Sequence, residues 1–263
     1  MSRLKKLELS NEEYHADLEY VSSSGFKLAL ESPKQFHDKY INKIPTEDKK
    51  SEALLLGTYV HSLVLEPTKV KDEYVIFSGA SSKSKAYDAF CKENPDKIVI
   101  PMKVHQQALS YMFSLATAKV NYNGKEIYVK DLFKNGETEV SLFREDTKTK
   151  VRFDYVDKEN GIIRDLKTTS KPITQESIQE TMESLGYDLS AYMYCEHLQD
   201  WAKCSVVTYE LVFVHKPTGQ WTVARVSDTT LRKGQYKYKM AVDRVNKWKE
   251  GGKVHLVPDV LIV

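Results

Sequence analysis

Two aspartates and a lysine lie close together in the sequence, and the two carboxylates could help to hold a metal ion. Asp154 is followed eleven residues later by Asp165, which opens a tripeptide that ends at Lys167. A third carboxylate, Glu139, begins a β-like stretch upstream. Two carboxylates about 4 Å apart at a partly buried site repel by about 4 kcal/mol at an effective dielectric near 20, so their convergence calls for a cation. Oxygen ligands favour Mg²⁺ or Mn²⁺ over zinc, and such an ion activates water for hydrolysis.

The elements that must position these side chains are two strands joined by a tight turn. Residues 151–157 and 162–167 alternate in polarity, and Asn160-Gly161 favours a two-residue type I′ hairpin turn. In that register Asp154 faces Lys167 and lies diagonal to Asp165, so all three share one face. The other face carries Phe153, Tyr155, Arg164 and Leu166. The alternative is a solvated hairpin whose charges form surface ion pairs, each worth about 0 to 1 kcal/mol.

A histidine upstream could add a nitrogen ligand. His61 follows Gly57 by one helical turn, and the missing side chain at Gly57 would allow a close approach. In this predicted helix, Leu54, Thr58, His61 and Leu65 lie on one stripe. Taken alone, such a histidine is more often a hydrogen-bonded core residue, but the downstream acids favour ligation.

Together these residues resemble the PD-(D/E)XK nuclease superfamily, and more closely its RecE-type branch, the phage and prophage exonucleases known as exodeoxyribonuclease VIII. The resemblance implies an α/β fold in which helices flank a mixed central β-sheet. It also implies which residues form the centre. The metal ligands would be His61, Asp154, Asp165, the backbone carbonyl of Leu166 and, directly or through water, Glu139. Lys167 would orient the attacking water and help to deprotonate it.

Two further segments match this family. Residues 21–40 place serines before an apolar helix that ends at Pro33, like the entry helix of RecB-like and RecE-like nucleases, which makes Ser24 a candidate DNA contact. A later helix carries Tyr194 where the family has a tyrosine, but Ser190 stands where the family has glutamine. Tyr194 is therefore a second candidate DNA contact. A role in the core is equally open, because this tyrosine lies on an apolar helical stripe.

The composition limits the class of protein. With 263 residues, 41% of them hydrophobic, the chain can bury one substantial core. No apolar run is long enough to cross a bilayer and the first ten residues lack a secretory signal, so we expect a cytoplasmic protein of the bacterial host with no membrane partner. The three cysteines fit a reducing compartment and are too few for a four-cysteine iron–sulfur cluster.

A net charge of +2 does not by itself indicate nucleic acid, so any affinity must come from local clusters. The loop at residues 78–85 could meet phosphates through Lys83 and Lys85, although a merely solvated loop is the alternative. Residues 231–249 form a basic helical pattern with interleaved aromatic residues. That helix could follow a nucleic-acid backbone, cover a subunit contact or be an ordinary lysine-rich surface.

The remaining pattern predicts one nuclease domain over residues 1–263, with a mainly helical part at 1–135 that carries the histidine motif, a catalytic sheet core at 136–226, and a basic helix and tail at 227–263. Helices are expected over residues 24–40, 52–65, 85–92, 103–120, 176–201 and 231–249. Strands are expected over residues 74–77, 139–143, 151–156, 162–167, 205–214 and 220–226. The 103–120 helix has an apolar stripe formed by Leu109, Met112, Phe113, Ala116 and Val120.

The function that the resemblance implies is a metal-dependent exonuclease that degrades linear double-stranded DNA from 5′ to 3′. It would leave 3′ single-stranded tails for a RecT-like annealing protein and would work as a ring-shaped homo-oligomer. A structure-selective endonuclease with the same ligands is one alternative. Another is a non-catalytic DNA-binding or assembly protein with a degenerate site, for which the serine at position 190 is the motivating observation.

Overall fold

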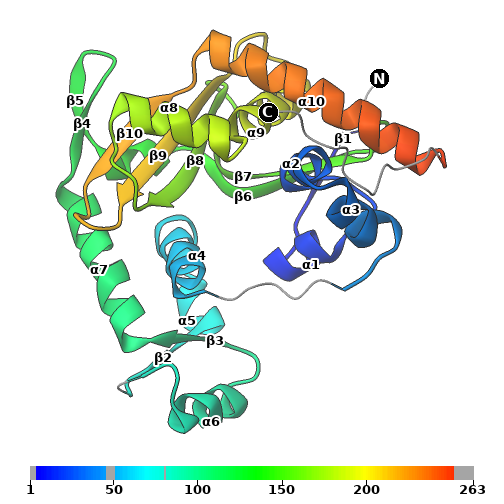
Figure 1. Cartoon of the computed structure of the whole chain (residues 1–263). Coiled ribbons are helices and arrows are strands. Elements are labelled where there is room, and N and C mark those ends of the chain that lie inside the picture. The colour runs from blue at the N-terminus through cyan, green and yellow to red at the C-terminus, as the bar shows by residue number, and fades with distance from the viewer. Residues whose placement is uncertain (1–3, 46–50, 80, 252–263) are drawn as a thin grey trace, which may run out of the picture.

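A six-stranded sheet forms the centre of the computed structural model, which describes residues 4–45, 51–79 and 81–251 (Figure 1). The strand order is β1-β6-β7-β8-β9-β10, and all neighbours are antiparallel except β8 and β9, which are parallel. The strands are β1 (Leu4–Leu7), β6 (Glu137–Arg144), β7 (Thr149–Asp157), β8 (Ile162–Thr169), β9 (Thr208–His215) and β10 (Trp221–Arg225). Helices lie on both faces of this mixed sheet, as the predicted fold class requires.

The hairpin between β7 and β8 has a different turn from the expected one. Its innermost pair is Asp157 with Ile162, so residues 158–161 form a four-residue turn. A type I′ turn needs positive φ at both central residues, whereas within 158–161 only Gly161 has one, at +65°. The carboxylate of Asp157 accepts hydrogen bonds from the backbone and side-chain nitrogens of Asn160, at 3.0 and 2.7 Å, and thereby favours the wider turn. The register therefore shifts by two, and Asp154 lies opposite Asp165 instead of Lys167.

One face of the sheet is covered by three helices, of which α9 and α10 lie towards the top of Figure 1. They are α2 (Ser23–Glu31), α9 (Tyr187–Ala202) and α10 (Asp228–Lys249). Their apolar side chains share one buried cluster with β6, β7 and β9, in which Phe26, Phe153 and Met193 are almost fully buried. Phe26 and Tyr238 meet edge to face, at 5.2 Å between ring centroids, and so hold α2 against α10.

The other face is packed against α4 (Glu52–Leu65) and α7 (Met102–Thr117). A second buried cluster joins Tyr59 and Tyr111 of these helices to Tyr155 and Leu166 of the sheet. The α4 helix has the expected bounds. It begins after Ser51, whose side chain accepts a hydrogen bond from the backbone of Leu54 and so caps the helix. This cap and the packing behind it set the position of His61 in the third turn.

Smaller elements complete the described part of the chain. They are α1 (Asn11–Ala16), α3 (Pro33–Phe36), η1 (His37–Ile41), α5 (Val70–Glu73), β2 (Tyr74–Phe77), α6 (Lys85–Glu93), β3 (Ile98–Pro101), β4 (Lys119–Tyr122), β5 (Lys125–Tyr128), η2 (Val129–Phe133) and α8 (Gln175–Ser184). The β2 strand pairs with β3 and the β4 strand with β5, outside the central sheet. Among the described residues, no helix is long and apolar enough to span a bilayer.

The expected 24–40 helical segment is divided at Pro33, as its sequence indicates, and the expected 176–201 helix is interrupted. The first breaks at Ser32 because Pro33 begins a new short helix and lacks the N–H that would continue the old one. The expected 176–201 helix breaks between α8 and α9 at Gly186, whose φ is +61°. Residues 252–263 of the expected C-terminal tail lie outside the described residues.

The long α7 helix ends at Thr117, and its expected apolar stripe faces the core only in part, since Met112 and Val120 pack at the edge of the second cluster while two larger residues are exposed. Phe113 is 77% exposed and Leu109 is 47% exposed. The buried face is a different one, formed by Val104, Ala108, Tyr111 and Leu115. Tyr111 explains the rotation, because its hydroxyl donates a hydrogen bond to the carbonyl of Lys216 beyond β9 and fixes this face inward.

Candidate metal and catalytic centre

Side chains from α4, β6 and β7 meet at one point beside the sheet. His61, Glu139 and Asp154 each offer a ligand atom, and these atoms lie within 4.8 Å of one another. The Nδ1 atom of His61 lies 3.6 Å from Oδ2 of Asp154. The structure therefore brings together three residues that are far apart in the sequence, in an arrangement that could hold one metal ion.

Irregular backbone geometry in β6 and β7 positions the carboxylates of Glu139 and Asp154. Glu139 has a φ of +52°, an unusual conformation for a residue with a side chain, and the ladder between β6 and β7 pairs the residues on either side of it but not Glu139 with Asp154. The alternation of β7 also breaks here. Phe153 packs in the cluster beneath α2 and α9, whereas Tyr155 packs in the cluster with α4 and α7. The expectation that Phe153 and Tyr155 share a face is wrong, because the strand kinks at Asp154.

Asp165 and Lys167 lie beside the trio and are engaged with each other. Lys167 Nζ lies 2.6 Å from Oδ2 of Asp165. Between them, the backbone N–H of Leu166 donates to Oδ2 of Asp154 at 2.8 Å, and the carbonyl of Leu166 lies 3.4 Å from Lys167 Nζ. All five predicted site residues and the predicted carbonyl thus border one small region, although Asp165 stands outside the group of mutually close ligand atoms.

The electrostatics of the region show a deficit of positive charge. Burial, and the nearby carboxylate of Glu66, raise the pKa of Glu139 to about 7. Burial and the charge of Asp165 raise the pKa of Asp154 as well. Burial lowers the pKa of His61 to about 4, so its imidazole is neutral at pH 7, as a metal ligand must be. A neutral imidazole beside carboxylates that lack a counter-charge fits a divalent cation.

The charge state of Lys167 differs from the expectation. Burial disfavours its ammonium form, but the carboxylates of Asp165 and Asp154 outweigh that effect and raise the pKa above its ordinary value. The pKa shift therefore favours the protonated form of Lys167 over the expected role in deprotonating water. Its ammonium group is suited to orient a water molecule or a phosphate oxygen.

Two neighbours of this centre were not found from the sequence. Lys27 of α2 and Lys167 both lie over the ring of Tyr187, with Nζ 5.4 and 5.5 Å from its centroid. Burial and the charge of Lys167 lower the pKa of Lys27. No spacing rule links residues 27, 167 and 187, since only the packing of α2 and α9 on the sheet brings them together.

Arg152 is a third residue that the sequence did not single out. Its Nε lies 3.9 Å from Oε2 of Glu139 and donates to Ser141 Oγ at 2.8 Å. Its Nη2 donates to the carbonyls of Leu9 and Ser10. Arg152 therefore links Leu9 and Ser10 to the sheet next to the candidate metal ligand Glu139. In the sequence, only its position next to the apolar Phe153 in an alternating strand indicated that it lies on the opposite side of β7.

The four predicted DNA contacts lie in different surroundings. Ser24 is exposed at the start of α2, and its hydroxyl lies 2.9 Å from that of Ser22. Tyr194 is half-buried and packs edge to face between Phe153 and Tyr209, an arrangement that suits a core role. Lys83 and Lys85 are exposed at the start of α6, which lies at the end of the molecule away from α10 (Figure 1). These two lysines are not brought to the trio.

Comparison with known proteins places this geometry in a family. A model of the PDDEXK-like domain of unknown function (DUF3799) matches residues 22–254. The chain belongs to this family. The predicted membership of the PD-(D/E)XK superfamily and the predicted fold class are thereby confirmed, and the chain is a PDDEXK-like nuclease. No curated protein sequence matches the chain.

One solved structure shows a similar fold, and a second is only weakly similar. One, described as a candidate exonuclease from Eubacterium rectale, has a TM-score of 0.65 at 20% identity and covers 94% of this chain and 89% of its own. Another, a phage-related exonuclease from Haemophilus somnus 129PT, has a TM-score of 0.35 at 14% identity and covers 88% of this chain and 96% of its own. The second likeness is too weak to carry an argument, and the first concerns the fold alone.

Proposed function

We propose that this PDDEXK-like nuclease is a Mg²⁺-dependent exonuclease that degrades one strand of linear double-stranded DNA from 5′ to 3′. The observation that carries the proposal is the meeting of His61, Glu139 and Asp154 next to the ion pair of Asp165 and Lys167. The description of the Eubacterium rectale structure as a candidate exonuclease supports this choice over other nuclease activities.

The roles of the residues follow from their chemistry. His61, Glu139 and Asp154 would hold the ion, with Asp165 and the carbonyl of Leu166 as further ligands at its border. Mg²⁺ bound there would lower the pKa of a water molecule and neutralise charge that builds on the phosphate; Mn²⁺ could replace it. Lys167 would orient the attacking water by donating a hydrogen bond, and Asp165 would keep that ammonium group in place through the 2.6 Å contact.

The test compares linear with covalently closed circular duplex DNA in the presence of Mg²⁺. An exonuclease needs an end, so only the linear DNA should be degraded, and Asp165→Ala should show no degradation. Release of a label from the 5′ end before one from the 3′ end would support the proposed polarity. Cleavage of the closed circle would instead favour a structure-selective endonuclease. Equal results for wild type and Asp165→Ala would refute a catalytic role for this centre.

The proposal extends to partners. The 3′ single-stranded tail would be the substrate of a RecT-like annealing protein, and a ring-shaped homo-oligomer would keep the enzyme on its DNA. Light scattering after size-exclusion chromatography tests the ring, since a monomeric mass would contradict it. Co-elution with a purified annealing protein tests the partner, and separate elution would count against a stable complex.

A further inference from the structure

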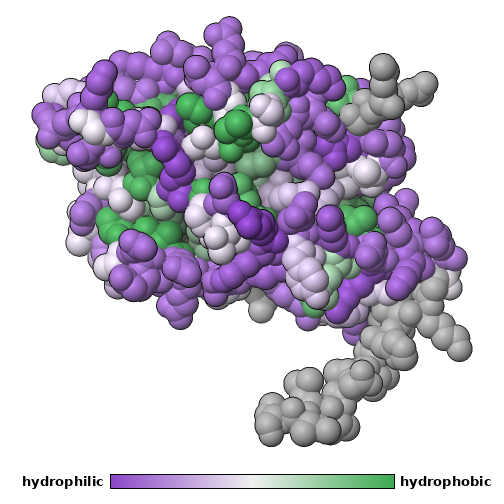
Figure 2. Space-filling model, turned by 90° about the horizontal axis from the view of Figure 1, so that it is seen from above, coloured by the Kyte–Doolittle hydropathy of each residue, from purple (hydrophilic) through white to green (hydrophobic). Residues whose placement is uncertain are grey.

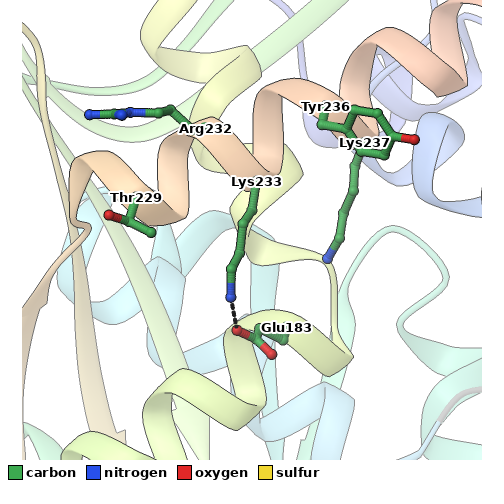
Figure 3. Close-up of a pocket in the computed structure, with 6 residues that line it drawn as sticks. All are labelled: Glu183, Thr229, Arg232, Lys233, Tyr236 and Lys237. Carbon is green, nitrogen blue, oxygen red and sulfur yellow. Dashed lines mark hydrogen bonds and ion pairs between the residues drawn. The ribbon is translucent and has the colours of Figure 1, made fainter.

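A hollow in the surface lies between α8 and the first half of α10 (Figure 3). It is lined by Glu183, Thr229, Arg232, Lys233, Tyr236 and Lys237. We call these six residues the α10 hollow. Hydrophilic side chains predominate on the surface seen from above in Figure 2, which is the side on which α10 lies in Figure 1. The hollow thus belongs to a water-exposed face and not to the core.

The two faces of α10 are clearly separated. The residues of the hollow recur at positions 229, 232, 233, 236 and 237, which is the spacing of one helical face. The buried face uses Gly234, Tyr238, Ala241 and Val245. A Cβ atom at Gly234 would lie 2.0 Å from the carbonyl oxygen of Asp188, so α10 is seated directly on the start of α9. This contact fixes the rotation of α10 and keeps the basic face outward.

The charges of the hollow are positive in excess. Lys233 pairs with Glu183 at 2.7 Å, and Lys237 pairs with the fully buried carboxylate of Asp188 at 2.7 Å. Arg232 is exposed and forms no ion pair with any residue that the structure describes. Beside it, the ring of Tyr236 is 68% exposed, which is unusual for a side chain with so much apolar surface.

The hollow is connected to the candidate metal centre through adjacent residues. Lys237 contacts Asp188, and the next residue along α9 towards its start is Tyr187. The ring of Tyr187 faces the ammonium groups of Lys27 and Lys167. Lys27, Lys167 and Lys237 therefore all contact the start of α9, at Tyr187 and Asp188.

We propose that the α10 hollow binds single-stranded nucleic acid. Arg232, Lys233 and Lys237 contact phosphates, and one base stacks on Tyr236. Proteins that bind single strands combine a basic groove with exposed aromatic rings, because an unpaired base offers its flat face whereas a paired base is already stacked. The bound strand would be the one that adjoins the cleaved phosphodiester, an assignment that rests on the proposed function. The binding itself does not.

The experiment measures the binding of a fluorescein-labelled oligothymidylate by fluorescence anisotropy in EDTA, so that no cleavage is needed. Tyr236→Ala should weaken binding about fivefold or more, whereas Tyr236→Phe should stay within about twofold of wild type because the ring is kept. Arg232→Ala should weaken binding and reduce the salt dependence, log K against log salt, by about 0.7, as expected for the loss of one phosphate contact.

The matched control is Lys239→Ala, which removes one exposed positive charge from the same helix outside the hollow. The proposal is overturned if Arg232→Ala and Tyr236→Ala bind like Lys239→Ala, or if wild type binds no oligonucleotide. If the variants lose affinity only for a blunt-ended duplex probe, the single-strand assignment is overturned and the hollow is a duplex-binding surface. Cleavage by wild type, measured separately with Mg²⁺, distinguishes failure of this proposal from failure of the proposed nuclease activity.

Discussion

Asp154 carries a charge that its surroundings compensate poorly, so replacing it tests the metal centre directly. Burial and the carboxylates of Asp165 and Glu139 disfavour its ionised form, and Lys167 only partly offsets them. The ligand oxygens of Glu139 and Asp154 lie within 4.8 Å of each other. At that separation two unit charges repel by about 3.5 kcal/mol at an effective dielectric of about 20.

Asp154→Asn should therefore stabilise the protein without metal. The asparagine oxygen can still accept the hydrogen bond from the backbone of Leu166, at a cost of about 1 kcal/mol for the lost charge assistance. Removal of the repulsion leaves a net gain of about 2 kcal/mol, which corresponds to a rise in Tm of about 4 to 8 °C for a chain of this size. The assay is thermal unfolding in EDTA at pH 8.5, where Glu139 is ionised.

Adding Mg²⁺ should raise the Tm of wild type but not that of Asp154→Asn. For wild type, a metal concentration ten times the Kd stabilises the folded state by about 1.4 kcal/mol and raises the Tm by a few degrees. Asp154→Asn should show no such rise. Asp157→Asn is the control, because its carboxylate lies on the same strand but caps the turn, so it should lose stability and keep the Mg²⁺ response. A lower Tm of Asp154→Asn in EDTA, or a preserved Mg²⁺ response, would refute the reasoning.

Three other substitutions test separate parts of the structure. Lys167→Ala should abolish cleavage but keep the Mg²⁺-induced rise in Tm, because Lys167 is not a ligand; loss of that rise would contradict its assignment. Glu210→Gln should destabilise the protein by about 3 to 5 kcal/mol in urea unfolding, because it leaves the Arg164 and Arg225 pairs at 3.0 and 2.9 Å without their buried carboxylate, and a loss below about 1 kcal/mol would argue against this network. Burial lowers the pKa of His197 to about 3. The unfolded state therefore takes up this proton first, and stability falls as the pH drops from about 6.5 towards 3. Wild type should lose more unfolding free energy between pH 7 and 5 than His197→Gln does, and equal losses would exclude this residue as a cause.

The local elements could be predicted because their signals are local. The bounds of α4 follow from a serine cap and a helical apolar period. The start of β8 follows from the turn residues before Ile162, although the strand runs two residues beyond the expected end, to Thr169. The hairpin register was wrong by two because the carboxylate of Asp157 stabilises a wider turn than Asn160-Gly161 suggests. That competition between two turn geometries involves a side-chain hydrogen bond, which a dipeptide preference does not include.

The residues of the site that could not be predicted from the sequence are brought together by packing between distant segments. Lys27 and Tyr187 approach Lys167 only because α2 and α9 lie on the same face of the sheet. The positive φ of Glu139 is equally invisible in the sequence, since glutamate has no preference for that conformation. A residue held there costs about 1 to 3 kcal/mol, so the surrounding strands must supply the stability that keeps it in place.

The way in which β7 and β8 separate explains how the sheet can carry a reactive site. The pairing of the two strands ends at Tyr155 and Arg164. Beyond that point the side chain of Asp154 accepts a hydrogen bond from the backbone N–H of Leu166. On its other edge, β8 stays paired with β9 through Lys167 and beyond. One edge of β8 is therefore rigid while the other is open to the carboxylates of β6 and β7. Reactive groups on such a strand are held in position by the sheet and are still accessible from one side, which is the combination that a preorganised centre needs.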